Sequence, residues 1–220
     1  MQILAVRTAR LIAYLNAEEL NPEGRPLAHD YLNAFVERYS FIKRPTTPTE
    51  ILDPEDKGIT FELGKFANFA INKVVLFDTA VAIETAASTD ASEEILQDML
   101  SWGAATFGLS NRPDLITRRA YVSEIVFSSA LSLRAINPDI QTLANMITRL
   151  VGGYMGNSLP FETIGINMAF DSTQSKQIYT PFSLHRLADT PFTENKYYSA
   201  APLQTSDHIA VLNDFETFLE

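Results

Sequence analysis

Cysteine is missing from this chain, and histidine is scarce: 220 residues contain only His29, His185 and His208. Thiolates and imidazoles supply most nucleophilic cysteine chemistry, most zinc sites and most acid–base switching near neutral pH. Their scarcity leaves no recognisable metal-ligand cluster and no cysteine nucleophile. A Ser–His–acid triad is not excluded, because triads assemble from distant positions, but nothing in the sequence signals one. We therefore expect no cofactor and no metal site.

Long apolar runs and phosphate-binding fingerprints are missing as well. No stretch approaches the ~20 apolar residues that a membrane-spanning helix needs, and residues 1–7 lack the pattern of a signal peptide. The glycine-rich stretch 152–157 follows a predicted helix, whereas phosphate-binding loops precede one. We expect a cytoplasmic protein with no membrane partner.

The composition is that of a folded, acidic protein. Apolar residues make up 46% and charged residues 20% of the chain, and the net charge is −10. Such a charge disfavours binding to nucleic acid or to anionic lipid, because both rely on cationic neutralisation. Arg112, Arg118 and Arg119 form the one basic group, and we interpret them as solvated or ion-paired residues.

The pattern of elements predicts an α+β fold, a largely antiparallel sheet built from hairpins with three to four helices packed against it. We expect a single domain over residues 1–220. The sequence leaves open a small N-terminal subunit, residues 1–44, joined through the Pro/Thr stretch 45–49. Expected strands cover 2–14 (where a helix would also fit), 58–63, 69–86 as two strands, 121–127, 161–170 and 177–184. Expected helices cover 27–39, 90–107, 138–151 and 206–219.

Residues 69–86 predict a hairpin whose register follows from a turn at Asp78-Thr79. This turn places Val74 opposite Ile83 on a wholly aliphatic face, and Lys73 opposite Glu84 on the second face. Near the turn the second face is also apolar, so another element or another subunit must cover it. We expect an interface there, formed by four residues: Val75, Phe77, Ala80 and Ala82.

Aromatic residues gather in the stretch 180–198, around a strand that Pro181 places at a sheet edge. An edge of this kind can add a peptide strand or hold a neighbouring subunit. The aromatic residues can equally close the core beneath a loop. The predicted interface there consists of Phe182, Phe192, Tyr197 and Tyr198.

Helix 138–151 begins at Asn137-Pro138, a helix N-cap followed by proline in the first turn, and is expected to stop at Gly152-Gly153. Its apolar residues recur at helical spacing, which predicts a face packed on the core. This face consists of Ile140, Leu143, Ile147, Leu150 and Val151.

Catalytic candidates are weak. His185 and Arg186 place a titratable base beside an anion binder, with Asp189 nearby, but no nucleophile stands at a meaningful spacing. The acidic residues Glu62, Asp78, Glu84 and Asp90 lie on or beside neighbouring strands, where a cluster would bind Mg²⁺. Glu84 already faces Lys73, however, and Asp78 suits a turn.

These observations favour a non-catalytic interaction or assembly module that forms a homo-oligomer or joins a larger protein complex. The alternative is an enzyme acting on a phosphate-bearing or nucleotide-like substrate through acidic residues such as Glu84, with His185 and Arg186. A small-ligand binding domain also remains open, because periodicity does not reveal a pocket.

Overall fold

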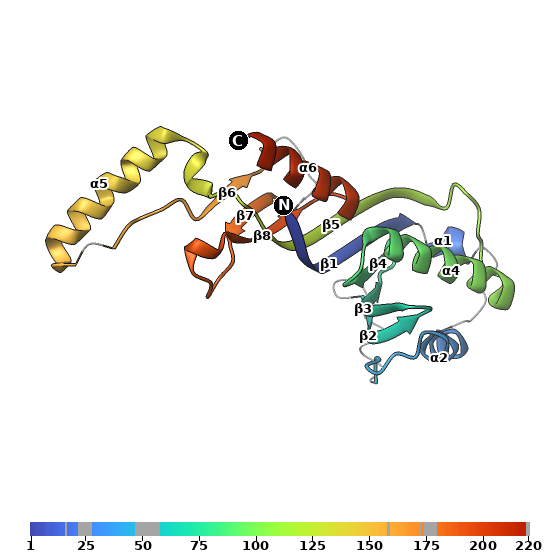
Figure 1. Ribbon diagram of the computed structural model, residues 1–220. Helices are drawn as coiled ribbons and strands as arrows, with labels where there is room; N and C mark the ends of the chain where they lie inside the picture. The colour runs from blue at the N-terminus through green and yellow to red at the C-terminus, as the bar shows by residue number, and fades with distance from the viewer. Residues whose placement is uncertain are drawn as a thin grey trace. The chain divides into compact units, whose positions relative to one another are not determined.

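A computed structural model describes residues 1–15, 17–21, 28–46, 58–157, 159–171, 173 and 180–218 (Figure 1). The chain divides into two compact units. The larger unit comprises residues 6–123 and 202–206, and the smaller unit comprises residues 1–5, 124–201 and 207–220. Of the predicted joint at 45–49, residues 47–49 lie outside the described residues.

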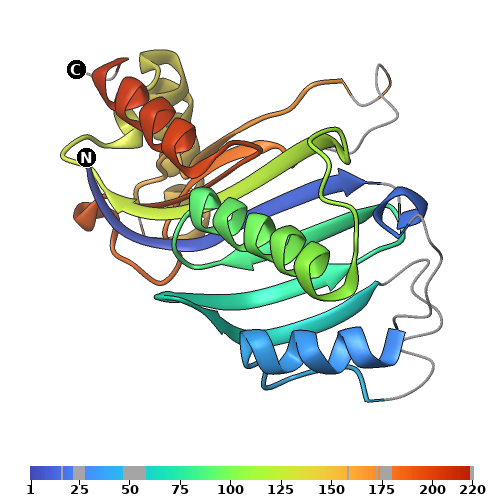
Figure 2. The same ribbon diagram turned by 90° about the vertical axis from the view of Figure 1, so that its right-hand side faces the viewer.

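The larger unit is an antiparallel sheet with helices on one face. Its elements follow in chain order: most of β1 (Gln2–Leu15), α1 (Ala17–Leu20), α2 (Ala28–Tyr39), β2 (Ile59–Phe66), β3 (Phe69–Leu76), β4 (Ala80–Thr85), α4 (Thr89–Phe107) and the first part of β5 (Ile116–Ser128). Figure 2 shows α4 running across the strands, and it contacts β4.

The smaller unit combines the ends of two long strands with the C-terminal third of the chain. Its elements are, in chain order: the start of β1, the end of β5, the 3-10 turn η1 (Leu133–Ala135), α5 (Pro138–Met155), β6 (Gly165–Met168), β7 (Phe182–Arg186), the 3-10 turn η3 (Phe192–Glu194), β8 (Lys196–Ala201) and most of α6 (Thr205–Phe218).

All eight strands belong to one antiparallel sheet in the order β2-β3-β4-β1-β5-β8-β7-β6. With five α-helices among the described residues, the fold is α+β, as the sequence predicts. Strand β8 was not predicted. Because β8 pairs with β7, and β6 pairs with β7 on its other side, β7 is an inner strand and the prediction that it lies at the edge is wrong. Pro181 precedes β7 and removes no hydrogen bond from it.

The predicted hairpin register is confirmed. Val74 pairs with Ile83 and Lys73 with Glu84, and the Phe77 amide donates to the Ala80 carbonyl across the turn. One face supplies the aliphatic core of the larger unit, since Val74 and Ile83 are fully buried.

The second face carries a row of alternating charges across five backbone segments. Register pairs join Lys43 to Glu62, Glu62 to Lys73, Lys73 to Glu84 and Glu84 to Arg10. Opposite charges directly across strands stabilise a sheet by roughly 0.2–1 kcal/mol each. Arg10 donates to one Glu84 oxygen through both Nε and Nη2, at 3.0 and 2.7 Å. This face is therefore suited to water over its charged row.

An aromatic cluster fills the space between α2, α4 and the sheet. Phe35 is fully buried, and its ring lies 5.0 Å from the rings of both Tyr39 and Phe61. Trp102, the single tryptophan of the chain, lies 6.4 Å from Phe35. Helix α4 is held over the strands at its start, where the Ser92 hydroxyl donates to the Ala9 carbonyl.

The ends of two helices differ from the sequence prediction by a few residues. Helix α4 is capped by Ser88 rather than by Asp90, because the Ser88 side chain accepts a hydrogen bond from the Ala91 amide. Helix α5 runs through its two glycines and ends at Gly156, which adopts the left-handed conformation with φ 67°.

Replacing Phe35 by Ala should lower the free energy of unfolding of the larger unit by about 3–5 kcal/mol, because a fully enclosed ring leaves a cavity. The measurement is urea unfolding followed by Trp102 fluorescence, which reports on the same cluster. Ile42→Ala is the matched control: its side chain is 77% exposed, so its effect should stay within about 0.5 kcal/mol. Equal effects of the two changes would contradict this assignment of the core.

Asp98→Asn should remove a pH-dependent part of the stability of the larger unit. Burial raises the pKa of Asp98, but hydrogen bonds from Arg38 and Tyr39 together with the Arg38 charge outweigh it and hold the pKa below its usual range. The contribution is therefore complete above the unfolded-state value of about 4 and is lost as the pH falls through the folded-state pKa. The gap in urea midpoint between wild type and variant should shrink from pH 7 to about pH 3; a constant gap would contradict this reading.

Candidate docking surface

Arg186, a predicted catalytic candidate, is buried at the end of β7, and its guanidinium is hydrogen-bonded to the protein. Its Nη2 donates to Glu162 Oε2 at 2.9 Å and to Ser132 Oγ at 3.0 Å. Its Nη1 donates to the Phe192 carbonyl at 2.9 Å, and its Nε donates to the Thr163 carbonyl at 3.4 Å. The Phe192 ring lies 4.3 Å from Cζ. Binding of an anionic substrate by Arg186 would require displacement of Glu162.

The structure does not bring His185 and Arg186 into one site. Consecutive residues of a strand point to opposite faces, so the two side chains diverge. The His185 Nε2 lies 3.1 Å from the Asn167 Oδ1 on the neighbouring β6. Asp189 lies in the turn after β7 with φ 56° and is exposed.

Two of the four predicted carboxylates, Glu84 and Glu62, are engaged with cations, and the other two, Asp78 and Asp90, are exposed. Glu84 is paired with Arg10, and Glu62 accepts from the Lys43 amine at 3.0 Å, which lowers the pKa of Glu62. Within the described part of the chain no group of three or more His, Asp or Glu side chains is placed to hold a metal ion.

A buried Ser–His pair, Ser199 and His208, was not predicted from the sequence. The Ser199 Oγ lies 2.9 Å from the His208 Nε2, and both residues are fully buried. The Ser199 hydroxyl donates its proton to the Ser183 carbonyl at 2.7 Å. The hydroxyl therefore accepts from His208, which is the reverse of the donation that activates a serine nucleophile. This pair joins β8 to α6 and is a structural contact.

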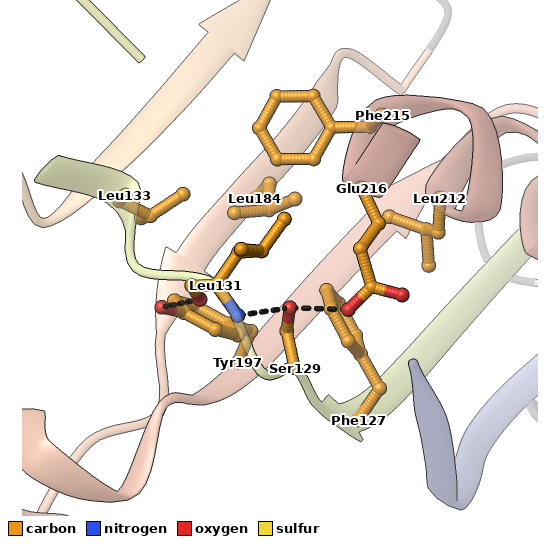
Figure 3. A pocket seen from close by; sticks show the side chains of 9 residues that line it. All are labelled: Phe127, Ser129, Leu131, Leu133, Leu184, Tyr197, Leu212, Phe215 and Glu216. Atoms are coloured by element: carbon orange, nitrogen blue, oxygen red, sulfur yellow. Dashed lines mark hydrogen bonds between the residues drawn. The ribbon is translucent and has the colours of Figure 1, made fainter. Parts of the chain in front are cut away.

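A small hollow in the smaller unit also lacks the character of a ligand site (Figure 3). It has room for about one water molecule. The polar groups at its wall bond to one another: the Ser129 hydroxyl donates to Glu216 and accepts from the Leu131 amide. Glu216 also pairs with the Met1 amine, and these two hydrogen bonds lower the pKa of Glu216. No polar group drawn there is left for a substrate.

The structure buries three of the eight predicted interface residues and leaves the other five wholly or partly accessible. The buried residues are Val75, Ala80 and Tyr197. The half-buried residues are Phe77, Ala82, Phe182 and Tyr198, and Phe192 is exposed. Part of the second hairpin face is covered by backbone at Gly58, whose φ is +65°: a Cβ there would lie 2.6 Å from Val75 and 2.8 Å from Phe77. A docking role for the less buried residues stays a prediction.

The prominent apolar surface of the smaller unit lies instead on α5. The sequence prediction that the apolar face of this helix packs on the core is wrong. All residues of α5 are described, and only Ala144 among them is buried. Figure 1 shows α5 standing clear of α6 and of strands β6–β8 within its unit.

Four large side chains form a continuous exposed row along α5, which we call the α5 stripe. They recur at spacings of three and four residues, which places them on one face of the helix. They are Leu143, Met146, Leu150 and Tyr154, with exposed fractions of 56%, 49%, 46% and 81%. Ile140 and Met155 are also exposed beside the two ends of the stripe.

Both ends of the segment that carries α5 are fixed to the strands of the smaller unit by the contacts of Arg186. Ser132 precedes the segment and Glu162 follows it, and one guanidinium nitrogen of Arg186 bonds to both. Within the segment, the Phe161 amide donates to the Thr148 hydroxyl at 2.8 Å, which holds the returning chain against α5. The α5 stripe is thus presented on an anchored support.

Comparison with known proteins assigns no role to any of these residues. No protein-family model matches the chain, and no curated protein matches it. The function is therefore inferred from the contacts and the exposure of the described residues.

Arg186→Gln should destabilise the smaller unit by about 3–5 kcal/mol, because it removes the buried guanidinium that holds Glu162 and Ser132 and leaves only the half-exposed Arg134 beside the largely buried Glu162. Arg134→Gln is the matched control: Arg134 pairs with the same carboxylate at 3.4 Å, but its side chain is 52% exposed, so at most about 1 kcal/mol should be lost. Urea unfolding followed by circular dichroism measures both. Similar losses for the two variants would contradict the anchoring role of Arg186.

Proposed function

We propose that this protein is a non-catalytic assembly module whose docking element is the α5 stripe. The observation that carries the proposal is the exposure of four large apolar side chains in one row of a helix. Scattered exposed apolar residues are normal, but a contiguous patch of several hundred Å² on an otherwise folded protein marks an interaction site. Helices dock on partners through residues at this spacing.

The energetics support docking. Complete burial of one large aliphatic side chain is worth about 1.5–3 kcal/mol, so roughly half of that remains to be gained at Leu143, Met146 and Leu150. Tyr154, which is still more exposed, adds aromatic area at a low cost in side-chain entropy. Because Ser132 and Glu162, on either side of α5, both bond to Arg186, less ordering entropy opposes binding than for an unanchored helix.

A protein partner fits α5 better than a lipid surface does. Helices that lie on membranes carry lysine and arginine on their polar face, whereas Asp139 and Arg149 are the only charged residues of α5. The chain as a whole has a net charge of −10, which opposes approach to anionic lipid. Among the described residues, no helix has the length and apolar character needed to cross a bilayer.

The double change Leu143→Glu with Leu150→Glu should abolish stoichiometric recovery of a partner, whether another protein or an untagged copy of this chain, when the tagged chain is captured from its source-cell lysate. Two carboxylates would have to be desolvated in the contact. Asn145→Glu is the matched control, because it adds a charge to an exposed position on the other side of α5 and should leave recovery unchanged. Equal recovery by all three proteins would overturn the proposal.

A further inference from the structure

We infer that the partner seated on the α5 stripe is a second copy of this chain, and that the two α5 helices pair antiparallel about a two-fold axis. This inference rests on the proposed function and names its partner. It follows from the distribution of charge along the chain, from the symmetry of the stripe and from the area that the stripe offers.

The segment around α5 carries few charges and no net charge, which favours it as a place where two copies can meet. Residues 129–170 contain two acids, Asp139 and Glu162, and two bases, Arg134 and Arg149, so the segment is neutral. The rest of the chain then holds 25 of the 27 acids and 15 of the 17 bases, a net charge of −10. The net charge repulsion between two copies comes from residues outside this segment, whereas contact through the neutral segment adds none.

The stripe is self-complementary when one helix is reversed. Its steps of three, four and four residues keep the four side chains on one face of the helix. With the two-fold axis between positions 146 and 147, Leu143 lies opposite the partner's Leu150, and Met146 lies beside the axis. Tyr154 then lies opposite the partner's Asp139, with Ile140 as the next residue. The central residues Leu143, Met146 and Leu150 therefore meet apolar residues of the second copy in an isologous contact, and Tyr154 meets its polar end.

The antiparallel direction follows from the ends of the helix. Asp139 occupies the first turn, where it complements the positive end of the helix dipole. A parallel pair would place two Asp139 carboxylates and two positive helix ends side by side. An antiparallel pair instead sets the positive end of each helix beside the negative end of the other.

Gly153 adds an independent observation. It continues the row of Met146 and Leu150 at the next helical spacing, and a Cβ built there would meet nothing within 4 Å. A glycine in a helix interior costs roughly 0.5–1 kcal/mol relative to alanine. No neighbour among the described residues requires glycine here, whereas a small residue on an exposed helix face allows the backbone of a second helix to approach closely.

The area is sufficient for a stable pair. Five exposed side chains, those of the stripe and Ile140, each present on the order of 100 Å² of apolar surface, or on the order of 500 Å² per copy. A standard interface buries about 800 Å² per partner, which the polar rim of two helices can complete. We therefore expect a Kd on the order of 1 μM or tighter.

Sedimentation velocity of the full chain, over concentrations on both sides of about 1 μM, tests the second copy. Wild type and Asn145→Glu should pass from the 24.5 kDa chain to twice that mass, whereas Leu143→Glu with Leu150→Glu should remain at 24.5 kDa. Below about 1 μM, where wild type is also a single chain, all three should keep the same unfolding midpoint, since the positions are exposed. A wild type of single-chain mass throughout, or a dimer that the double change leaves intact, overturns the inference.

The absence of cysteine makes the direction of the pair testable, because each introduced thiol is unique in its chain. Under an added oxidant, Met146→Cys should form a disulfide between two copies. Ile140→Cys alone and Tyr154→Cys alone should each form no disulfide between copies, since identical positions at the helix ends would lie about 20 Å apart. A mixture of the two variants should form a disulfide between position 140 of one copy and position 154 of the other. Asn145→Cys should not cross-link. Self-cross-linking at 140 and 154 would show a parallel pair, and cross-linking at 145 alone would place the contact elsewhere; either overturns the antiparallel pair.

The outcomes also separate this inference from the proposed function. If wild type is a single chain while the double glutamate variant still loses a stoichiometric foreign partner in the capture assay, self-pairing is overturned and the docking role of α5 is retained. If neither assay responds to the double change, both are overturned.

Discussion

The buried ion pair between Arg186 and Glu162 is the contact on which the arrangement of the smaller unit depends. A guanidinium has five N–H donors in a fixed plane, so one side chain can hold several segments at defined positions. Here it joins the end of β7 to Ser132, to Thr163 and to the turn that contains Phe192. Removal of one partner from such a pair leaves a buried charge, which is why it acts as a strict constraint on the chain path. It also holds the segment that carries α5, because Ser132 before that segment and Glu162 after it both bond to Arg186.

Apolar helix faces are buried to different extents in the two units, and this difference supports the proposed docking role of α5. Around Phe35 the larger unit encloses a dense aromatic cluster, and α4 buries its apolar face on the strands. Helix α5 has an equally clear apolar face but buries only Ala144. Since both helices obey the same hydrophobic periodicity, the difference lies in what covers them, and the part of the chain that the structure describes provides no cover for the α5 stripe.

The sequence predicts local pairing well and distant contacts poorly. The turn at Asp78-Thr79 sets the register of its hairpin, since a two-residue turn between apolar strands allows one pairing, and the structure has it. Helical periodicity likewise located α5. It did not reveal that α5 is exposed, because periodicity identifies an apolar face without identifying what lies opposite. Strand β8 was missed because Tyr197 and Tyr198 follow a proline-containing stretch that reads as irregular, and the Arg186–Glu162 pair spans 24 positions that no motif connects.

In an acidic protein, a neutral and apolar helix such as α5 can make the choice of contact surface specific. Specificity depends on the difference between the intended contact and its competitors, and repulsion in the competitors contributes as much as attraction in the intended one. The negative charge outside residues 129–170 penalises most encounters between copies, and the alternating row that runs from Lys43 to Arg10 presents paired charges rather than apolar area. An apolar stripe in such a surrounding can remain exposed without causing indiscriminate aggregation. This distribution of charge is one reason why we propose association through α5, where the charges balance and the apolar area is available.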